Sequence, residues 1–422
     1  MKILVVGNGG REHAMVWKLA QSPRVDKIYC AAGNAGIGQL AELVPIQPME
    51  IDKLVAFAKE NAIDFTAVGM DDPLAAGIVD AFQAAGLRVF GPRKNAALIE
   101  SSKAFSKGLM KKYGIPTAAY ETFTDPVAAR AYVEKHPLPV VLMADGLALG
   151  KGVLICQTRE EALAGLDEIM VSKKFGAAGN TVVVEEFLTG PEVSVLAFCD
   201  GTHLVPMVSA QDHKRALDND QGLNTGGMGA FSPSKIYTPE VAATCMETIF
   251  MPTVRAMAAE GRPFVGCLYF GLMLTPDGMK VIEYNCRFGD PETQAVLPRL
   301  KSDLLTIMEA CVDGTLDKTP VEWADEAAVC VVLASGGYPE SYQKGYPITG
   351  LAEAEARPNT LVFHAGTAQK DGQFVTNGGR VLGVVGLGKT MEEAIATAYA
   401  GADCIQFEKK HFRHDIGIKK NQ

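Results

Sequence analysis

Short apolar runs alternate with amphipathic stretches over the first hundred residues of the chain. The run at 2–6, KILVV, has the apolar and β-branched composition of a buried strand. The stretch at 74–85 has the apolar spacing of a helix. Further strand-like runs follow at 27–30, 64–68 and 88–90. Strands that alternate with helices are typical of a doubly wound parallel sheet, so we expect an N-terminal α/β domain at residues 1–101.

A helix predicted at 101–113 marks the boundary to a second domain. Gly114 and Pro116 follow it, and this combination commonly ends a helix. We place the second domain at residues 102–325. Its predicted strands lie at 139–143, 181–186, 264–275 and 279–285, and the turn sequence Pro-Asp-Gly joins the last two.

Residues 209–233 follow no regular pattern. A structureless stretch of this length inside a compact domain is usually functional or disordered. Its charged and amide residues flank several glycines, which favours a substrate loop; a plain linker is the alternative.

A third unit is predicted at residues 326–422. Strands are expected at 328–334 and 380–385, and a helix is expected to run from Thr390 to about Ala402. Thr390 and Glu393 have the spacing of a capping box at the start of that helix.

Composition and charge exclude several classes of protein. The chain has 422 residues, enough for roughly two to four domains. A net charge of −9 argues against a broad nucleic-acid or anionic-membrane surface. The nine cysteines are scattered, odd in number and form no CxxC pair, as expected for reduced thiols in the cytoplasm. A strand-like run begins at Lys2 instead of a signal peptide, and no apolar run approaches the ~20 residues of a membrane span.

The strongest candidate chemistry lies on the predicted strand at 280–286. Side chains of a strand alternate between faces, so Glu283, Asn285 and Arg287 should share one face with Val281. The other face should carry Ile282, Tyr284 and Cys286. A carboxylate and an amide oxygen in this arrangement suit a magnesium ion that also binds nucleotide phosphates, and a guanidinium suits a carboxylate or phosphoryl group. A surface strand with polar residues facing solvent is the alternative.

Two glycine-rich loops could bind phosphate. Gly7 and Gly9 follow the first strand and precede a helix, so backbone amides there could face an anion. The third glycine of a dinucleotide fingerprint is replaced by Glu12, which argues against NAD and leaves a ligand-free turn as the alternative. The loop at 144–153, ADGLALGKGV, contains Lys151 and could close over phosphates or form a flexible hairpin tip.

Several separated motifs identify a family resemblance. They are GNGGREHA at 7–14, SSKAFSK at 101–107, ADGLALGKGV at 144–153, EEFLTG at 185–190, QDHKR at 211–215, NTGGMGAFSP at 224–233 and EYNCRFGDPETQ at 283–294. Together they resemble the glycinamide ribonucleotide synthetase family of the ATP-grasp superfamily, essentially end to end.

The resemblance implies a fold and an activity. The expected fold is of mixed α/β and α+β class. It combines the N-terminal doubly wound parallel sheet, a central two-part ATP-grasp fold with a mobile flap at about 120–190, and a C-terminal β-rich domain. The implied enzyme is a ligase of purine biosynthesis. It joins glycine to 5-phospho-β-D-ribosylamine through a glycyl phosphate, uses ATP with Mg²⁺ or Mn²⁺, and is expected to act as a cytoplasmic monomer.

The resemblance also implies roles for individual residues. Those expected to bind ATP are Lys103, Lys151, Gly152, Glu185, Glu186, Phe187, Leu188 and Glu192. Those expected to bind the substrates are Gly9, Gly10, Asp212, Asn224, Thr225, Gly226, Arg287 and Asp290. Glu283 and Asn285 would bind the metal, and Arg287 would also be catalytic by steadying the acyl phosphate.

Two departures from the family pattern bear on activity. The family has a lysine immediately before the ADG motif, where this chain has Met143. Its loss could cost a few kcal/mol of electrostatic stabilisation, so an ATP-grasp protein that binds nucleotide with impaired catalysis is the alternative function. The family sequence GPEAPL is replaced by GMDDPL at 69–74, near the expected acceptor site, which raises the more distant alternative of a different amine acceptor.

Overall fold

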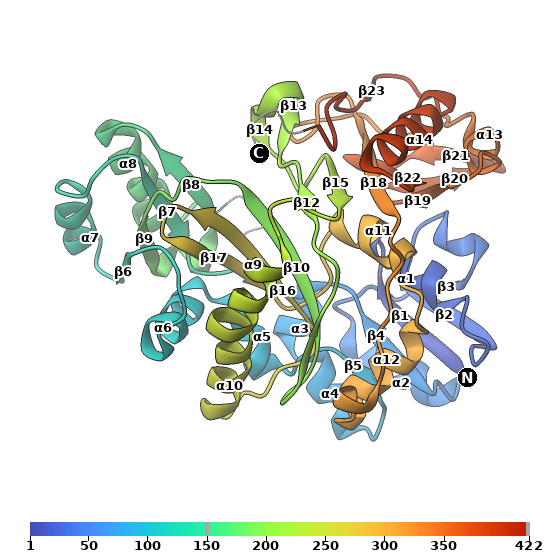
Figure 1. Ribbon diagram of the computed structural model, residues 1–422, viewed down its shortest axis with the longest axis horizontal. Coiled ribbons are helices and arrows are strands. Elements are labelled where there is room, and N and C mark those ends of the chain that lie inside the picture. The colour runs from blue at the N-terminus through green and yellow to red at the C-terminus, as the bar shows by residue number, and fades with distance from the viewer. Residues whose placement is uncertain (148–151, 419–422) are drawn as a thin grey trace.

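The computed structural model describes residues 1–147 and 152–418 (Figure 1). The N-terminal unit contains a five-stranded sheet in the order β3-β2-β1-β4-β5, with every pair parallel. Its strands are β1 (Lys2–Gly7), β2 (Lys27–Ala32), β3 (Glu42–Val44), β4 (Phe65–Val68) and β5 (Val89–Phe90), and its first helices are α1 (Gly10–Leu19) and α2 (Ile51–Glu60). The predicted doubly wound parallel sheet is confirmed. β3 was missed because it is only three residues long.

Two predicted helices differ in detail from the structure. The helix expected at 74–85 is two helices, α3 (Asp71–Ala76) and α4 (Ile78–Ala84), since Gly77 between them has a left-handed φ of 102°. The helix expected at 101–113 begins later: α5 (Lys94–Ser101) ends where it was to start, and α6 (Lys103–Tyr113) follows. Ser102 separates them and its hydroxyl accepts the N–H of Phe105, which makes it the N-cap of α6.

The central segment forms two antiparallel sheets. The first has the order β11-β10-β16-β17, and its last two strands form the predicted hairpin. Its strands are β10 (Glu192–Asp200), β11 (Leu204–Pro206), β16 (Val265–Thr275) and β17 (Gly278–Asn285). The second has the order β6-β9-β7-β8. Its elements are β6 (Tyr120–Phe123), α7 (Pro126–Val133), β7 (Val140–Ala144), β8 (Val153–Cys156), α8 (Arg159–Leu166) and β9 (Val182–Glu186). In Figure 1 this second sheet and its helices form the end of the molecule that is remote from the C-terminal helix α14 (Met391–Cys404).

A six-stranded sheet combines strands from the central and C-terminal segments. Its order is β12-β15-β18-β22-β19, and β23 also pairs with β18. The strands are β12 (Gln211–Asp212), β15 (Gly229–Ser232), β18 (Ala327–Ser335), β19 (Thr360–His364), β22 (Arg380–Gly388) and β23 (Lys410–His411). The expectation that 209–233 lacks regular structure is therefore wrong. The stretch also contains the ribbon of β13 (Arg215–Leu217) and β14 (Gln221–Asn224), and strands of two to four residues are too short to show a period.

The other elements complete the C-terminal and helical parts. They are α9 (Pro239–Cys245), α10 (Met251–Ala259), α11 (Glu292–Val296), α12 (Leu304–Asp313), α13 (Leu351–Glu355), β20 (Thr367–Lys370) and β21 (Gln373–Thr376). Half of the predicted capping box at α14 is present. The Thr390 hydroxyl accepts the N–H of Glu393, but the Glu393 carboxylate accepts the N–H of Lys389. None of the helices in the described part of the chain is long and apolar enough to cross a bilayer.

A buried carboxylate explains the unusual glycine loop after β1. Glu12 is fully buried, accepts the backbone N–H of Gly9 at 2.7 Å and pairs with Arg11 at 2.6 Å. A Cβ atom on Gly7 or on Gly69 would lie 2.4 Å from the Glu12 side chain. The amide at the start of α1 therefore already faces an anion, and the two glycines leave room for it.

Two glycine-to-alanine substitutions should shift the unfolding midpoint in opposite directions. Gly108 is exposed inside α6 with open space around its Cβ position, so Gly108→Ala should stabilise by about 1 kcal/mol. Gly69→Ala should destabilise by about 1–3 kcal/mol because its methyl group would displace the Glu12 carboxylate. Urea unfolding of both variants measures this, and a Gly69→Ala midpoint at or above wild type would contradict the packing described for Glu12.

Candidate active site

Strand β17 presents Glu283 and Asn285 on one face. A β-bulge just before Glu283 places Val281 on a different face from the one predicted. Glu283 lies opposite Gly271 and Asn285 opposite Tyr269, whereas Val281 lies opposite Leu272, so one extra residue is inserted between Val281 and Glu283. A bulge reverses the alternation of faces beyond it. Val281 is accordingly buried in the core with Tyr284 and Cys286, and its expected place on the face of Glu283 is wrong. Glu283 and Asn285 are both half-buried.

The Glu283 carboxylate is held in its ionised form. Burial raises its pKa, but the positive charges of Lys214, Lys103 and Arg287 outweigh burial and leave the pKa below its usual value. Within the described residues, neither Glu283 nor Asn285 makes a side-chain hydrogen bond, and no cation lies within 4.0 Å of Glu283. An ionised carboxylate beside an amide oxygen is a donor set that fits a hard divalent cation.

Arg287 is fixed by carboxylates from the N-terminal unit. Its Nη2 lies 2.9 Å from Glu100 at the end of α5 and 3.7 Å from Asp71 at the start of α3. Glu100 also accepts the backbone N–H of Cys286 at 2.7 Å. Burial raises the pKa of Glu100. Burial alone would lower the pKa of Arg287, but the charges of Glu100 and Asp71 outweigh it and raise that pKa. The guanidinium is therefore charged and held in one place.

Residues from all three units meet around Asp290. Nη1 of Arg380, at the start of β22, donates to the carbonyl oxygens of Asp290 and Gly226, each at 2.9 Å. The Asp290 carboxylate accepts from Gln294 Nε2 at 2.8 Å. Cβ atoms on Gly9 and Gly10 would lie 3.3 Å from that carboxylate and 2.6 Å from Gln294. Four of the predicted substrate residues, Gly9, Gly10, Gly226 and Asp290, thus lie together.

Lys214 connects other predicted residues. Its Nζ lies 3.0 Å from Glu192, the predicted ribose ligand, and its carbonyl oxygen accepts the N–H and the hydroxyl of Thr225 at 2.7 and 2.8 Å. Burial lowers the pKa of Lys214, yet Glu192, Asp212 and Glu283 raise it well above its usual value. Asn224 lies on the exposed β13–β14 ribbon opposite Arg215, and no contact within the described residues joins it to this group.

Lys103 is the first residue of α6, and Asp145 of the ADG motif secures that helix start. The Asp145 carboxylate accepts the N–H of Ala104 and the Ser102 hydroxyl, both at 3.0 Å. Met143 is buried beside Val141 and Val183, against Ala104. The residue that replaces the family lysine therefore faces the turn that carries Lys103.

Neighbouring side-chain and backbone groups fix the predicted adenine-binding segment, 185–188. Glu185 is buried and forms an ion pair with Lys107. Glu186 accepts the N–H of Ala119 at 2.9 Å and lies 3.6 Å from Lys280. Leu188 is half-buried and Phe187 is exposed, so Phe187 is available to a ligand. Gly152 precedes β8, and its carbonyl oxygen accepts the N–H of Ala144, while the role predicted for Lys151 lies outside the described residues.

Sequence reasoning missed the residues that orient these groups. They are Asp71, Glu100, Asp145, Lys214 and Arg380. Asp145 and Lys214 stand inside the motifs ADGLALGKGV and QDHKR, so motif membership was a usable signal for them. Glu100 and Arg380 have partners more than 80 residues away, and no local pattern marks such pairs.

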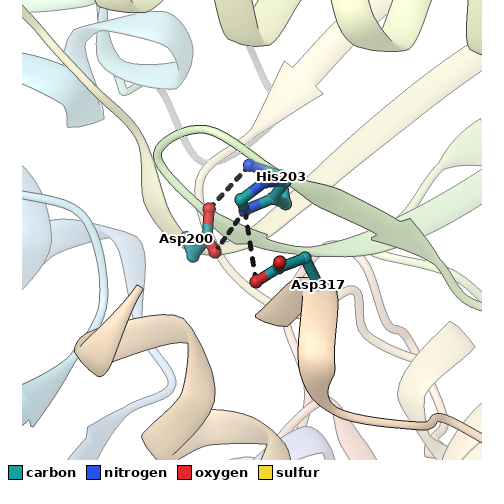
Figure 2. A group of neighbouring side chains, drawn as sticks. All are labelled: Asp200, His203 and Asp317. Atoms are coloured by element: carbon teal, nitrogen blue, oxygen red, sulfur yellow. Dashed lines mark hydrogen bonds and ion pairs between the residues drawn. The ribbon is translucent and has the colours of Figure 1, made fainter. Parts of the chain in front are cut away.

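One further polar cluster, Asp200, His203 and Asp317, lies apart from these residues (Figure 2). Asp200 accepts the backbone N–H groups of Thr202 and His203 at 2.9 and 2.6 Å, and its other oxygen lies 3.0 Å from Nδ1 of His203. Asp317 lies 3.9 Å from the same nitrogen. The Asp200 oxygens are occupied by these contacts, so the cluster fastens the turn between β10 and β11, and we assign no metal to it.

The fold and the site define an ATP-grasp protein, and comparisons with known proteins agree. The family models for the phosphoribosylglycinamide synthetase N domain, ATP-grasp (A) domain and C domain match residues 1–100, 101–293 and 328–419. The phosphoribosylamine–glycine ligase of Halalkalibacterium halodurans is 52% identical over 99% of this chain and 97% of its own length. That of Pasteurella multocida is 49% identical over 99% and 98%.

Solved structures give the same result. The phosphoribosylamine–glycine ligase from Thermotoga maritima has a TM-score of 0.86 at 35% identity and covers 98% of this chain and all of its own. A biotin carboxylase domain of Hydrogenobacter thermophilus 2-oxoglutarate carboxylase has a TM-score of 0.74 at 15% identity, over 97% of this chain and 91% of its own, which shows the shared fold alone. The chain belongs to the phosphoribosylglycinamide synthetase family. The predicted fold class and family are confirmed.

Removing Arg287 should lower stability because its buried partner Glu100 would lose its counter-ion. We expect Arg287→Ala to cost about 3–5 kcal/mol, and the double variant Arg287→Ala/Glu100→Gln to recover much of that loss. Urea unfolding of both variants measures the difference. Equal destabilisation by the single and double variants would mean that Glu100 does not depend on Arg287.

The Asp200–His203 contact should make stability depend on pH. The hydrogen bond to Asp200 raises the pKa of His203, so its stabilisation is fully present below the usual histidine pKa of about 6.5 and is lost as pH rises through the higher folded value. His203→Gln should therefore lower the Tm at about pH 5.5 and change it little at about pH 9. Calorimetry at the two pH values tests this, and an equal loss at both would indicate an uncharged packing role.

Proposed function

We propose that this chain ligates glycine to 5-phospho-β-D-ribosylamine, with ATP converted to ADP and phosphate. The product is glycinamide ribonucleotide, an intermediate of purine biosynthesis in the cytoplasm. The proposal rests mainly on sequence identity. Over 99% of its length, this chain is 52% and 49% identical to two proteins named phosphoribosylamine–glycine ligase. The residues gathered around Glu283, Arg287 and Asp290 support it.

The reaction has two steps. The glycine carboxylate attacks the γ-phosphorus of ATP and forms glycyl phosphate as ADP leaves. The amine of phosphoribosylamine then attacks the glycyl carbonyl carbon, and phosphate leaves as the amide forms and the amine loses a proton. Phosphoryl transfer depends mainly on positioning and charge neutralisation, which fits the concentration of fixed charges at this site.

Each group of residues has a role in this scheme. Glu283 and Asn285 would hold Mg²⁺ or Mn²⁺, which neutralises phosphate charge when bound. Lys103 and Lys151, with Gly152 of the flap, would contact the nucleotide phosphates. Backbone groups and one carboxylate of 185–188 would contact adenine, and Glu192 would contact ribose. Arg287, fixed by Glu100, would stabilise the charge that develops on the transferred phosphoryl group.

The acceptor site would lie where the three units meet. The predicted substrate residues Gly9, Gly10, Gly226 and Asp290 lie together there. Thr225 donates a hydrogen bond to the carbonyl oxygen of Lys214, and Asp212 lies two residues before Lys214 in the chain. Gly9 and Gly10 allow the side chains of Asp290 and Gln294 to approach the backbone closely. We further propose that the protein acts as a monomer.

An ADP-release assay tests the proposed function. Release should require glycine, phosphoribosylamine and Mg²⁺ together, and Mn²⁺ should replace Mg²⁺. Glu283→Gln should lower kcat about 100-fold or more, because one of the two protein oxygens that hold the metal becomes neutral. Alanine in place of glycine is the matched substrate control.

The same assay separates the two functions considered. Nucleotide binding without glycine-dependent turnover would favour the impaired nucleotide-binding protein, the alternative that Met143 suggests. A Met143→Lys variant then measures whether a lysine beside Ala104 lowers the KM for ATP. Turnover with a different amine acceptor would trace instead to Asp71 and Asp72.

A further inference from the structure

The C-terminal tail, residues 411–417, lies against the β13–β14 ribbon of the central segment. Arg413 of the tail is only 1% exposed, and its Nε and Nη2 each donate to the Asp415 carboxylate at 2.7 Å. Its Nη1 donates to the Asp220 carboxylate at 2.8 Å and to the carbonyl oxygen of Arg215 at 3.1 Å. One buried guanidinium thus joins the tail to the turn of the ribbon and to strand β13.

Other groups of the tail bind the same turn. The backbone N–H of His414 donates to the Asp218 carboxylate at 2.7 Å. The Asp415 carboxylate accepts the backbone N–H of Asn219 at 2.9 Å. The turn is therefore held through its side chains and through its backbone.

Helix α14 fixes the tail in turn. The Tyr399 hydroxyl donates to the carbonyl oxygen of Arg413 at 2.7 Å and accepts the N–H of Ile416 at 2.9 Å. Ile416 is fully buried in the core of the C-terminal unit. The ribbon is thus attached to a firmly packed part of the C-terminal unit.

The ribbon has little support of its own. β14 is exposed along its whole length, and its pairing with β13 contains a register shift. A hairpin of two strands is marginally stable alone in water. The turn also has two successive residues with left-handed φ, Asn219 at 58° and Asp220 at 54°. Such a conformation persists where surrounding contacts hold it, and here the tail provides them.

The ribbon leads directly to predicted substrate residues. Asn224 ends β14 opposite Arg215, whose carbonyl oxygen Arg413 binds. Thr225 follows, and its hydroxyl donates to the carbonyl oxygen of Lys214 at 2.8 Å. The positions of Asn224 and Thr225 therefore depend on β13, and through β13 on Arg413.

We propose that Arg413 is a positioning residue of the acceptor site and fixes the ribbon so that Asn224 and Thr225 meet phosphoribosylamine. This inference rests on the proposed function. Arg413 is enclosed and touches no substrate, so it acts through the ribbon. Among the described residues, the tail makes no hydrogen bond or ion pair with those predicted to bind ATP. Loss of the tail contacts should therefore weaken binding of phosphoribosylamine and leave binding of ATP unchanged.

Two variants test this role. Asp218→Ala/Asp220→Ala removes the carboxylates through which the turn binds the tail and leaves the buried Arg413–Asp415 pair intact. The KM for phosphoribosylamine should rise about tenfold, while the KM for ATP stays within about twofold of wild type. Arg413→Lys keeps the positive charge but loses the planar fork that binds Asp415 twice, so it should raise the same KM.

Asp313→Ala is the matched control. It also removes an exposed carboxylate that an arginine binds, since Arg88 donates to Asp313 at 2.9 and 2.7 Å, but this pair joins the N-terminal unit to α12. Its KM values should equal those of wild type. Hydrogen exchange measures the ribbon directly, and the amides of residues 215–225 should exchange faster in the two variants than in wild type and control.

The inference fails if both variants keep the wild-type KM for phosphoribosylamine, or if both KM values rise together, because the tail would then only support the fold. Unchanged exchange of the ribbon would likewise show that it is held without the tail. Absence of turnover in the wild type would overturn the proposed function and this inference with it. Normal wild-type turnover with an unchanged KM in both variants would overturn this inference alone.

Discussion

The candidate site depends on pairing charges that the fold removes from water. Arg287 follows β17 of the central segment, and its closest partner, Glu100, belongs to the N-terminal unit. Arg380 of the C-terminal sheet reaches Asp290 and Gly226 of the central segment. A buried charge without a partner is strongly destabilising. Each of these ion pairs therefore fixes the position of one segment relative to another, and the three units meet where these buried charges are paired.

The shared six-stranded sheet reinforces this arrangement. β12 and β15 come from the central segment, whereas β18, β19 and β22 come from the C-terminal one. The stretch from Asp212 to Gly229 leaves this sheet and returns to it, so its substrate residues are positioned by strands on both sides.

Long periodic segments were predicted well, and short or perturbed ones were not. The parallel strands of the N-terminal sheet and the β16–β17 hairpin were read from apolar runs and a turn sequence. Gly77 broke a helix whose apolar spacing continued across it. The bulge before Glu283 moved Val281 to the core, because an inserted residue is visible only against a partner strand. For the same reason, β12 to β15 could not be recognised from residues 209–233 alone.

The sequence by itself determined the family, the layer architecture and which residue types occur at the end of β17. These properties are local, since motifs, apolar periods and turn residues are all contained in short stretches of chain. Only the tertiary structure decided that Glu100 and Asp71 hold Arg287 and that Arg380 joins Asp290 to Gly226. These relations connect residues from 90 to more than 200 positions apart. Electrostatic energy depends on distance in space and on burial, and neither can be read from spacing along the chain.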